Sequence, residues 1–498
     1  MRKRAIRTLA VLVGVAGFLV AQTKIPEFPG VKPAPVYIGN PATVKPISAL
    51  PIPQNPFMAP GSWGAVHDDT YASDTYFTGG PLGNEPEVIS SYLGSQTAPG
   101  SVSPMLFTDD GRLIAIAVQV DRAAGTVSIS MVLLEADTLK PLFALPLPPP
   151  VVTEPISGKF RPAGVYFYLD NFGRVIAGTT ERTIWVVSHT STTLSHDATY
   201  GNLEIPEDHT IQALQPDFSG RIWLTTKQGL IETVNGTTGA LIGKYQLPDG
   251  ELIVNGHSAD ENSGVFIVST AAMYRFDADA SGKPVVTWRE PYDAGTHIKS
   301  GQVDIGSGST PTLMGTEYVT ITDNAQPKIN VLVYHRGKEV TGPRLHCIVP
   351  VFQGQSSNEQ SLIATDRSII VPNNYGYSSA DATTHGNTTK PGMARIDVEP
   401  YGCRTVWTNE EVVAPSVVNK MSVADGLIYS YTKPKGPANT DAWYFTALDF
   451  ESGAVVYSRL AGTGILYNNH YAPVYLGPDG KTLYAGVVGG IVAIRDTK

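Results

Sequence analysis

The chain has 498 residues, of which 42% are hydrophobic and 16% are charged, and its formal net charge is -9. So few charges argue against a disordered polyelectrolyte, and the negative balance argues against a nucleic-acid binder, because phosphate binding needs a surplus of Lys and Arg. The 49 Gly and 38 Pro indicate many turns and few long helices.

Residues 1–21 have the pattern of an export signal. Four basic residues among the first seven precede an apolar run from Leu9 to Ala21, which is short for a membrane span. We therefore expect a signal peptide over 1–21 and a mature chain that is secreted or periplasmic. The alternative is an uncleaved N-terminal anchor. No later stretch is long and apolar enough to cross a membrane, so we expect no transmembrane segment after cleavage.

Two segments precede the main domain. Residues 22–60 are rich in proline, which cannot donate a hydrogen bond within a central strand, so they predict an extended arm. Residues 61–100 contain the densest polar and aromatic cluster, with His67, Asp68 and Asp74 close together. Such carboxylates could bind Ca²⁺, although their spacing differs from an EF-hand loop. The structural alternative, which we favour, is a segment that packs on the main domain and covers one end of it.

From residue 101 to 498 short strand-like runs recur, each opened by a tight turn. The turn residues are Gly111, Gly173, Gly220, Gly264, Gly315, Asp366, Gly426 and Gly480, on average about 53 residues apart. Glycine supplies the positive φ of a hairpin turn, and the β-branched and aromatic residues that follow suit a pleated surface.

A second kind of hairpin lies between these turns. An apolar strand ends in Asp, a turn carries Gly, and the next strand closes on an aromatic residue, as in Asp449, Gly453 and Tyr457. Self-similarity at 40 to 60 residues, all strand and turn, is typical of a β-propeller, in which each blade is buried against its neighbours. The predicted fold class is therefore all-β, a β-propeller of eight four-stranded blades, with seven blades as the alternative.

The second hairpins, best seen in LDFESGAVVY (residues 448–457), resemble repeats of the quinoprotein alcohol dehydrogenase-like superfamily, the pyrroloquinoline-quinone repeat class. The resemblance covers roughly residues 100 to 495 and implies the propeller fold. Enzymes of that family use an adjacent Cys-Cys pair beside the quinone. Here Cys347 and Cys403 lie far apart, and no C-x-x-C-H cytochrome motif occurs. The sequence leaves open whether these two cysteines form a disulfide.

Candidate site residues follow from the propeller geometry. Loops that enter the innermost strands open onto the mouth of the central channel, so polar residues in these loops should converge. The expected catalytic residues are His209, His257, Glu359 and His470, and the expected ligand-binding residues are His67, Asp68, Asn358 and Asn469. Glu359 would be an anionic ligand or general base, and the histidines would be ligands or proton carriers. The alternative is that these groups cap strands or satisfy buried backbone groups.

The predicted function is an exported propeller that binds a small molecule at the polar mouth of its channel, with a chemical transformation left open. A divalent metal, Ca²⁺ or a transition metal, is the cofactor that such residues could hold. The alternative function is a non-catalytic scaffold for a protein partner, since a fold does not fix a function. A quinone-dependent dehydrogenase is the third hypothesis.

Overall fold

The structure, a computed structural model, describes residues 23–94, 98–121, 123–150, 166–437 and 439–498. The predicted signal peptide over 1–21 lies outside these residues. Nearly all regular structure in the described ranges is β-strand, and the two helical elements are short 3₁₀ turns, η1 (Ala380–Thr383) and η2 (Ile465–Tyr467). In this part of the chain no helix has the length and apolar character needed to span a bilayer.

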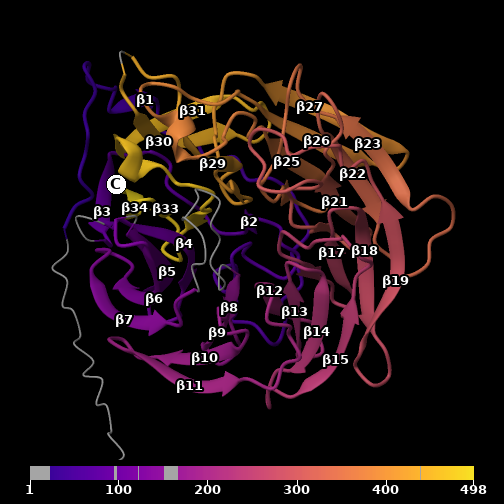
Figure 1. Cartoon of the computed structure of the whole chain (residues 1–498). Helices are drawn as coiled ribbons and strands as arrows, with labels where there is room; N and C mark the ends of the chain where they lie inside the picture. Colours follow the sequence, from indigo (N-terminus) through magenta and orange to yellow (C-terminus); the bar gives the residue numbers. More distant parts are fainter. Residues whose placement is uncertain (1–22, 95–97, 122, 151–165, 438) are drawn as a thin grey trace, which may run out of the picture.

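Eight antiparallel sheets are arranged in a ring around a central axis, as Figure 1 shows. Seven blades take four consecutive strands each. Blade 1 contains β4 (Gly100–Phe107), β5 (Arg112–Asp121), β6 (Thr126–Glu135) and β7 (Pro141–Leu147). Blade 2 contains β8 (Phe167–Leu169), β9 (Val175–Gly178), β10 (Ile184–His189) and β11 (Leu194–Tyr200). Blade 3 contains β12 (Ile211–Pro216), β13 (Arg221–Thr226), β14 (Leu230–Asn235) and β15 (Leu241–Gln246).

The ring continues in chain order through four more blades. Blade 4 contains β16 (Ser258–Ala259), β17 (Val265–Val268), β18 (Ala272–Ala278) and β19 (Pro284–Pro291). Blade 5 contains β20 (Thr312–Met314), β21 (Tyr318–Thr322), β22 (Asn330–His335) and β23 (Leu345–Pro350). Blade 6 contains β24 (Ile363–Ala364), β25 (Ser368–Pro372), β26 (Met393–Glu399) and β27 (Gly402–Asn409). Blade 7 contains β28 (Lys420–Ser422), β29 (Leu427–Thr432), β30 (Ala442–Asp449) and β31 (Val455–Thr463).

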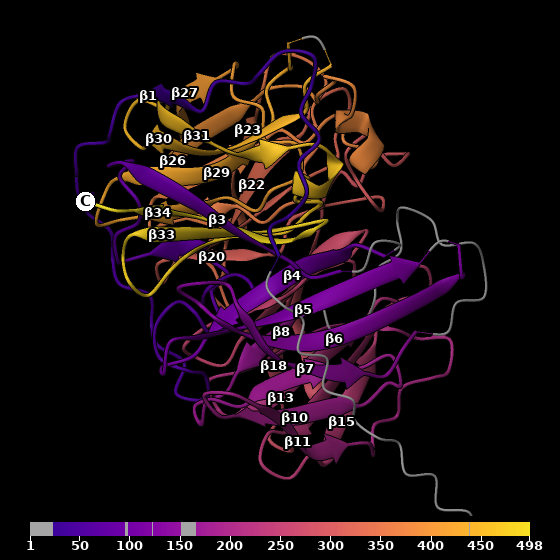
Figure 2. The same cartoon turned by 90° about the vertical axis from the view of Figure 1, so that its left-hand side faces the viewer.

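Blade 8 closes the ring with strands from both ends of the chain. Its inner strands are β32 (Val474–Leu476), β33 (Thr482–Val487) and β34 (Gly490–Asp496), and its outer strand is β3 (Pro86–Tyr92). Figure 2 shows β3 beside β34, to which it is paired antiparallel from Pro86↔Asp496 to Tyr92↔Gly490. The expected start of the propeller at residue 101 is therefore too late, because β3 belongs to a blade.

The eight predicted turns all lie between the first and second strands of the eight blades, so the eight-bladed prediction is confirmed. Local chemistry explains their recurrence. In blade 3 the Asp217 carboxylate accepts hydrogen bonds from the backbone N–H groups of Ser219 (2.8 Å) and Arg221 (3.1 Å), while Gly220 takes a φ of +80°. An Asp that ties down a turn and a Gly that tolerates positive φ are what this reversal requires.

Adjacent blades bury apolar side chains against each other. Trp223 and Ile231 of blade 3, for example, form one buried cluster with Ile267 and Phe276 of blade 4. Each such interface removes both faces of a blade from water, which accounts for the nearly continuous apolar runs in the inner strands. At the rim a disulfide joins Cys347 on β23 to Cys403 on β27, with the two Cα atoms 6.0 Å apart. It therefore links the outer strands of blades 5 and 6.

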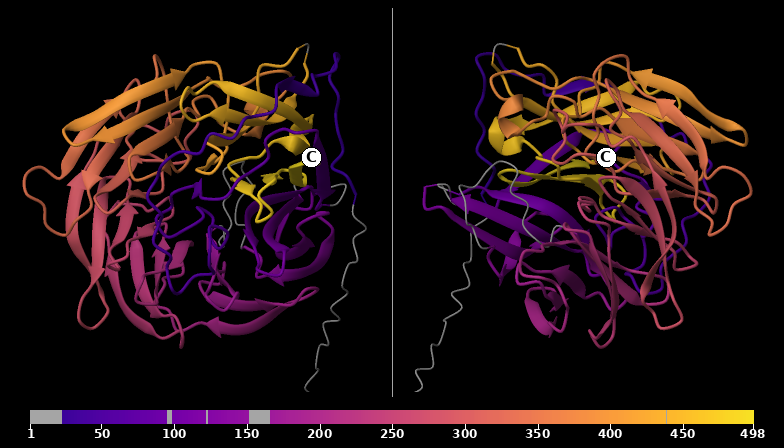
Figure 3. Two further views of the ribbon diagram at one scale, coloured as in Figure 1. Left: turned by 180° about the vertical axis from the view of Figure 1, so that it is seen from behind. Right: turned by 45° about the vertical axis from the view of Figure 1, so that its right-hand side comes forward.

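The proline-rich segment follows the outside of blade 7. Its strand β1 (Tyr37–Gly39) pairs with the outer strand β31, and the backbone N–H groups of Lys45 and Ile47 then donate to Asp425 and Val423 near the inner strand. Figure 3 shows this segment crossing the face of the ring seen from behind. The segment thus lies as an extended arm along the propeller surface.

Residues 55–76, which we call the plug segment, contact the inner strands of all eight blades. Short strand β2 (Thr75–Tyr76) pairs in parallel with β28. The other hydrogen bonds join Asn55 to Pro216, Ala59 and Gly64 to Leu169, Trp63 to Phe107 and Leu476, Thr70 to Ala259, Tyr71 to Leu313, Ser73 to Ala364 and Asp74 to Met421. The plug segment therefore occupies the axis of the ring and forms the floor on which the candidate site is built.

Candidate functional site

A cavity of about 740 Å³ opens at the axis above the plug segment. Every blade contributes to its wall through its innermost strand or through the residues that lead into that strand. One lining residue from each blade, in chain order, is Ser103, Tyr166, Gln212, Asn255, Thr310, Glu359, Val418 and His470. The convergence of these loops, inferred from the repeat, is therefore present in the structure, and the volume is in the range of small-molecule sites.

His67 is the plug residue with a polar side chain that lines this cavity. Its Nδ1 lies 3.2 Å from Oδ1 of Asp74 and 2.9 Å from the Ser361 hydroxyl, which also donates to Asp74. Because an ionised carboxylate only accepts, Nδ1 carries a proton, so Nε2 is the acceptor nitrogen when the ring is neutral. Nε2 lies 3.3 Å from the hydroxyl of Thr310, another lining residue. The arrangement can accept a hydrogen bond or a proton from a bound hydroxyl or amine.

Behind His67 lies a fully buried cluster of Asp68, Asp74 and Lys420. The Lys420 ammonium is 2.7 Å from Asp68 and 2.5 Å from Asp74. Burial would raise the pKa of Asp74, but Lys420 and His67 outweigh it and hold that pKa below its usual value. Burial dominates at Asp68, whose pKa is raised well above the ordinary range despite Lys420. One carboxylate thus stays ionised to orient His67, while the other is pushed toward its protonated form.

The cavity wall combines an apolar side with a polar, acidic side. Val118, Val120 and Leu466 are among the apolar lining residues. Glu359 and Asp381 are the acidic ones, and none of the described lining residues is Lys or Arg. At the described part of the wall an anion would meet carboxylates without a compensating cation, whereas a neutral or positively charged ligand would not.

Three of the residues predicted from the sequence line this cavity together. They are His67, Glu359 and His470, which come from the plug segment and from blades 6 and 8. The Glu359 carboxylate accepts a hydrogen bond from the backbone N–H of Val303 (3.1 Å). The His470 Nδ1 lies 3.0 Å from the Tyr377 hydroxyl, which fixes the ring at the cavity edge.

The other predicted residues lie outside the wall of the large cavity. His209 is partly exposed and contacts the Thr226 hydroxyl through Nδ1 (3.0 Å). His257 is buried beside a separate small chamber, and Asp68 is enclosed with Lys420. Asn358 bonds to the backbone of Gln360, and Asn469 bonds to the Ala472 carbonyl (2.7 Å). The last two residues thus stabilise loops, as in the structural alternative.

The predicted histidines do not form a shared metal site. Among the described residues, a single set of three or more His, Cys, Asp or Glu has its ligand atoms within 4.8 Å of one another, namely Asp109, Asp110 and His189. The two aspartates are exposed in the turn after β4 of blade 1, and His189 is the last residue of β10 in blade 2. The axial residues His209, His257, Glu359 and His470 therefore do not supply the clustered donors that a buried divalent ion needs.

The described lining residues do not fit pyrroloquinoline quinone either. That cofactor is a polycarboxylate, so its site needs cations, and the described wall carries Glu359 and Asp381 without Lys or Arg. The cysteines cannot act beside it, because Cys347 and Cys403 are paired with each other on outer strands.

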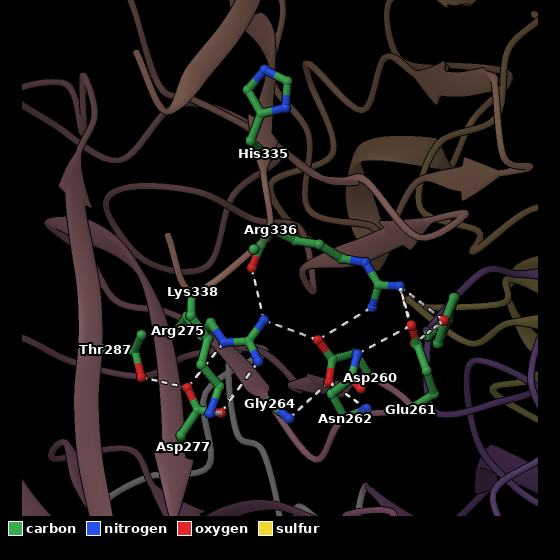
Figure 4. A network of polar contacts seen from close by, with 12 residues as sticks. Asp260, Glu261, Asn262, Gly264, Arg275, Asp277, Thr287, His335, Arg336 and Lys338 are labelled. Atoms are coloured by element: carbon green, nitrogen blue, oxygen red, sulfur yellow. Dashed lines mark hydrogen bonds and ion pairs between the residues drawn. The ribbon is translucent and has the colours of Figure 1, made fainter. Parts of the chain in front are cut away.

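A second buried ionic network, shown in Figure 4, lies farther from the cavity. The guanidinium groups of Arg275 and Arg336 both point toward Asp260, at 3.0 and 3.3 Å. Arg275 also pairs with Asp277 (3.0 Å), and Arg336 pairs with Glu261 (2.9 Å), which accepts a hydrogen bond from the Tyr71 hydroxyl. This network attaches the plug segment to blades 4 and 5.

Sequence reasoning missed several residues that build the site. Lys420 carried one available signal, since it is a lone Lys in the apolar run VVNKMSV. A cation in such a run indicates a buried carboxylate partner. Ser361, Thr310 and Asp381 carried no comparable signal, because a Ser, Thr or Asp in a polar loop is common.

Comparisons with known proteins give distant likenesses. No protein-family model matches the chain. An uncharacterized protein of Archaeoglobus fulgidus is 29% identical over 331 residues, which are 59% of this chain and 63% of that protein. The match therefore spans less than two thirds of that relative's length.

Solved structures of low sequence identity also match. BamB from Moraxella catarrhalis superposes with a TM-score of 0.46 at 12% identity, covering 83% of this chain and 97% of that one. The computationally designed Ika8 protein gives 0.45 at 10%, covering 81% and 98%. The β-propeller domain of Myceliophteria thermophila Cps50 (Swd1) gives 0.40 at 9%, covering 65% and 94%. The assignment of eight blades rests on the strand order described above.

Proposed function

We propose that the protein binds a small molecule, neutral or positively charged and bearing hydroxyl or amino groups, in the central cavity. The observation that carries this proposal is the position of His67. Its ring is oriented by Asp74 and Ser361, its Nε2 lies 3.3 Å from the hydroxyl of the lining residue Thr310, and His67 itself lines the cavity of about 740 Å³. The acidic character of the described wall supports the choice of ligand charge, and its apolar side suits a ligand with a hydrocarbon face.

The proposal includes a chemical capacity for His67. A neutral imidazole whose Nδ1–H is held by a carboxylate can accept a proton at Nε2 from a ligand hydroxyl, and the resulting imidazolium is stabilised by Asp74. Glu359 and His470 lie on the same wall and can bind the remaining polar groups of the ligand. These groups can bind such a ligand, and His67 can act as a general base if the ligand is reactive.

We also propose that the protein acts outside the cytoplasm, in a secreted or periplasmic setting. The export-signal pattern of residues 1–21 and the Cys347–Cys403 disulfide support this location, because structural disulfides persist in oxidising compartments.

A screen of small molecules in three charge classes tests the binding proposal. We expect ligand-detected NMR to find neutral polyhydroxylated and amine-bearing compounds as binders, with few anions. His67→Ala should weaken these binders at least about tenfold, because a lost hydrogen bond to a buried ligand is worth that much. His209→Ala is the matched control, since His209 lies outside the cavity wall and should leave binding unchanged. Binders that are mainly anions, or that persist in His67→Ala, would favour the scaffold alternative.

A further inference from the structure

A small chamber of about 20 Å³ lies next to the large cavity, and the two share His67, Val66 and Tyr166 as lining residues. The chamber is bounded by the plug segment and by blades 2, 3 and 4. Its polar lining includes His67, Asp69, Gln215 and His257. A space of this size holds one water molecule, which needs roughly 10–15 Å³ of this kind of volume.

Two side chains on the chamber wall have unmet hydrogen-bonding groups. His257 is 4% exposed, and neither of its ring nitrogens has a partner among the described residues. The amide nitrogen of Gln215, also buried, has none either. Burial lowers the pKa of His257 to about 3, so the ring is neutral and has one N–H donor and one acceptor nitrogen. Buried polar groups in this state indicate a missing partner.

The other polar groups of the chamber are already occupied. Asp69 accepts from the backbone N–H groups of Tyr71 and Ser73 and from the Ser73 hydroxyl, at 2.9, 3.3 and 2.6 Å. His67 uses Nδ1 for Asp74 and Ser361. A cation would therefore meet no free carboxylate and would face the N–H groups of Gln215. The unmet set contains both donors and an acceptor, which a cation cannot satisfy and a water molecule can.

We propose that this chamber is a binding site for one fixed water molecule, held by His257 and Gln215. The water donates to the unprotonated ring nitrogen of His257 and accepts from the Gln215 amide. The chamber is bounded by blades 2, 3 and 4 and by the plug segment, and it is also lined by His67. Through Gln215 and His257 the water joins blade 3 to the residues that lead into blade 4. The site is independent of what the large cavity binds.

A near-atomic-resolution crystal structure of the full chain is the first test. The expected result is one water-sized density peak within hydrogen-bonding distance of a His257 ring nitrogen and of the Gln215 amide, without anomalous signal. An empty chamber, or an ion identified by anomalous scattering, would overturn the proposal.

A variant and a solution measurement complete the test. In His257→Leu the acceptor is removed, so the peak should disappear while the ring of blades is retained. His209→Leu, at a partly exposed position, is the matched control and should keep the peak. In the native protein, ¹⁵N NMR of the His257 ring at neutral pH should show one protonated and one unprotonated nitrogen, with a cross-relaxation signal from a long-lived water. That measurement decides the matter even if His257→Leu does not fold, since a ring without contact to water would contradict the proposal.

Discussion

The two buried ionic clusters that hold the plug segment differ in charge balance. In the network of Figure 4, two guanidinium groups and the Lys338 ammonium face Asp260, Asp277 and Glu261. Arg275 overcomes the effect of burial and lowers the pKa of Asp277, while the Tyr71 hydroxyl and Arg336 do the same for Glu261. In the other cluster the Lys420 ammonium faces two carboxylates, of which Asp74 also contacts His67, and the pKa values of the two carboxylates move in opposite directions.

The difference shows that the ratio of cations to carboxylates distinguishes a cluster that only holds the plug segment in place from a cluster that can also affect the chemistry of the site. Where every carboxylate has its own cation, the pKa values of Asp277 and Glu261 are lowered and the network acts as a fixed attachment. Where two carboxylates share one ammonium group, burial raises the pKa of one of them, here Asp68, and this cluster lies beside the histidine of the cavity. Variants that change the balance can test whether the two clusters really have these separate roles.

The largest effect is expected for Lys420→Met. Removing the one cation leaves Asp68 and Asp74 buried and facing each other, and breaking a buried ion pair in this way costs about 3–5 kcal/mol of unfolding free energy. Urea unfolding followed by tryptophan fluorescence measures the loss. Adding Asp68→Asn should recover part of it, because the uncompensated carboxylate is removed. Arg336→Met is the comparison variant and should cost less, about 1–3 kcal/mol, because Asp260 keeps Arg275. The reverse order would contradict the comparison.

Removing the disulfide should have the next largest effect. The Cys347→Ser/Cys403→Ser double variant loses the constraint on a loop that spans 56 residues, and about 2–4 kcal/mol of stability should be lost. Because the bond lies at the rim, binding of the screened ligands should not change. A binding loss equal to that of His67→Ala would show that the rim and the cavity are coupled.

A pH-dependent effect of intermediate size is expected from His257. Its pKa is about 3 in the folded protein because burial disfavours the imidazolium, and it returns to about 6.5 on unfolding. The unfolded chain thus binds more protons in this window, so stability falls as the pH drops from about 6.5 toward 3. Between pH 7 and pH 4.5, His257→Leu should reduce this loss of unfolding free energy by about 2 kcal/mol. Urea midpoints at both pH values measure it, and His209→Leu should follow the native protein.

The smallest effect is expected for an exposed ion pair of the arm. Lys45 lies 2.7 Å from Asp449, but its side chain is 62% exposed, so solvent screens the interaction. Lys45→Ala should change the unfolding free energy by less than about 1 kcal/mol. Thermal melting at low and high salt is the measurement, and a larger loss would mean that the arm contributes to stability through that contact.

The fold was predictable because its signals are local and repeated. A turn such as that of Asp217 and Gly220 requires its residues within five positions, so it can be seen in the sequence each time that it recurs. The outer strand of blade 8 was not predictable in this way. Residues Pro86–Tyr92 pair with a strand about 400 positions away, and nothing in the segment itself specifies that partner.

The site was predictable only in part, for a related reason. His470 and Glu359 were found because the repeat places their loops at the channel mouth. The same rule also selected His209 and His257, since it fixes the position of a loop but not the direction of a side chain. The orientation of His67 depends on Asp74 of the same plug segment, and also on Ser361 and Lys420, which come from two distant parts of the chain. No local pattern specifies such a meeting.

The pairing of β3 with β34 also sets an order of assembly. During synthesis β3 and the plug segment emerge first, yet their partners in blade 8 are made last. The inner strands must therefore gather around a plug that is already present, and the ring can be sealed only when the final strand meets the early one. A chain that ends before β34 would leave the edge of β3 unpaired and the apolar interior of the ring open to water. We therefore expect the chain to be prone to aggregation until β34 has been synthesised.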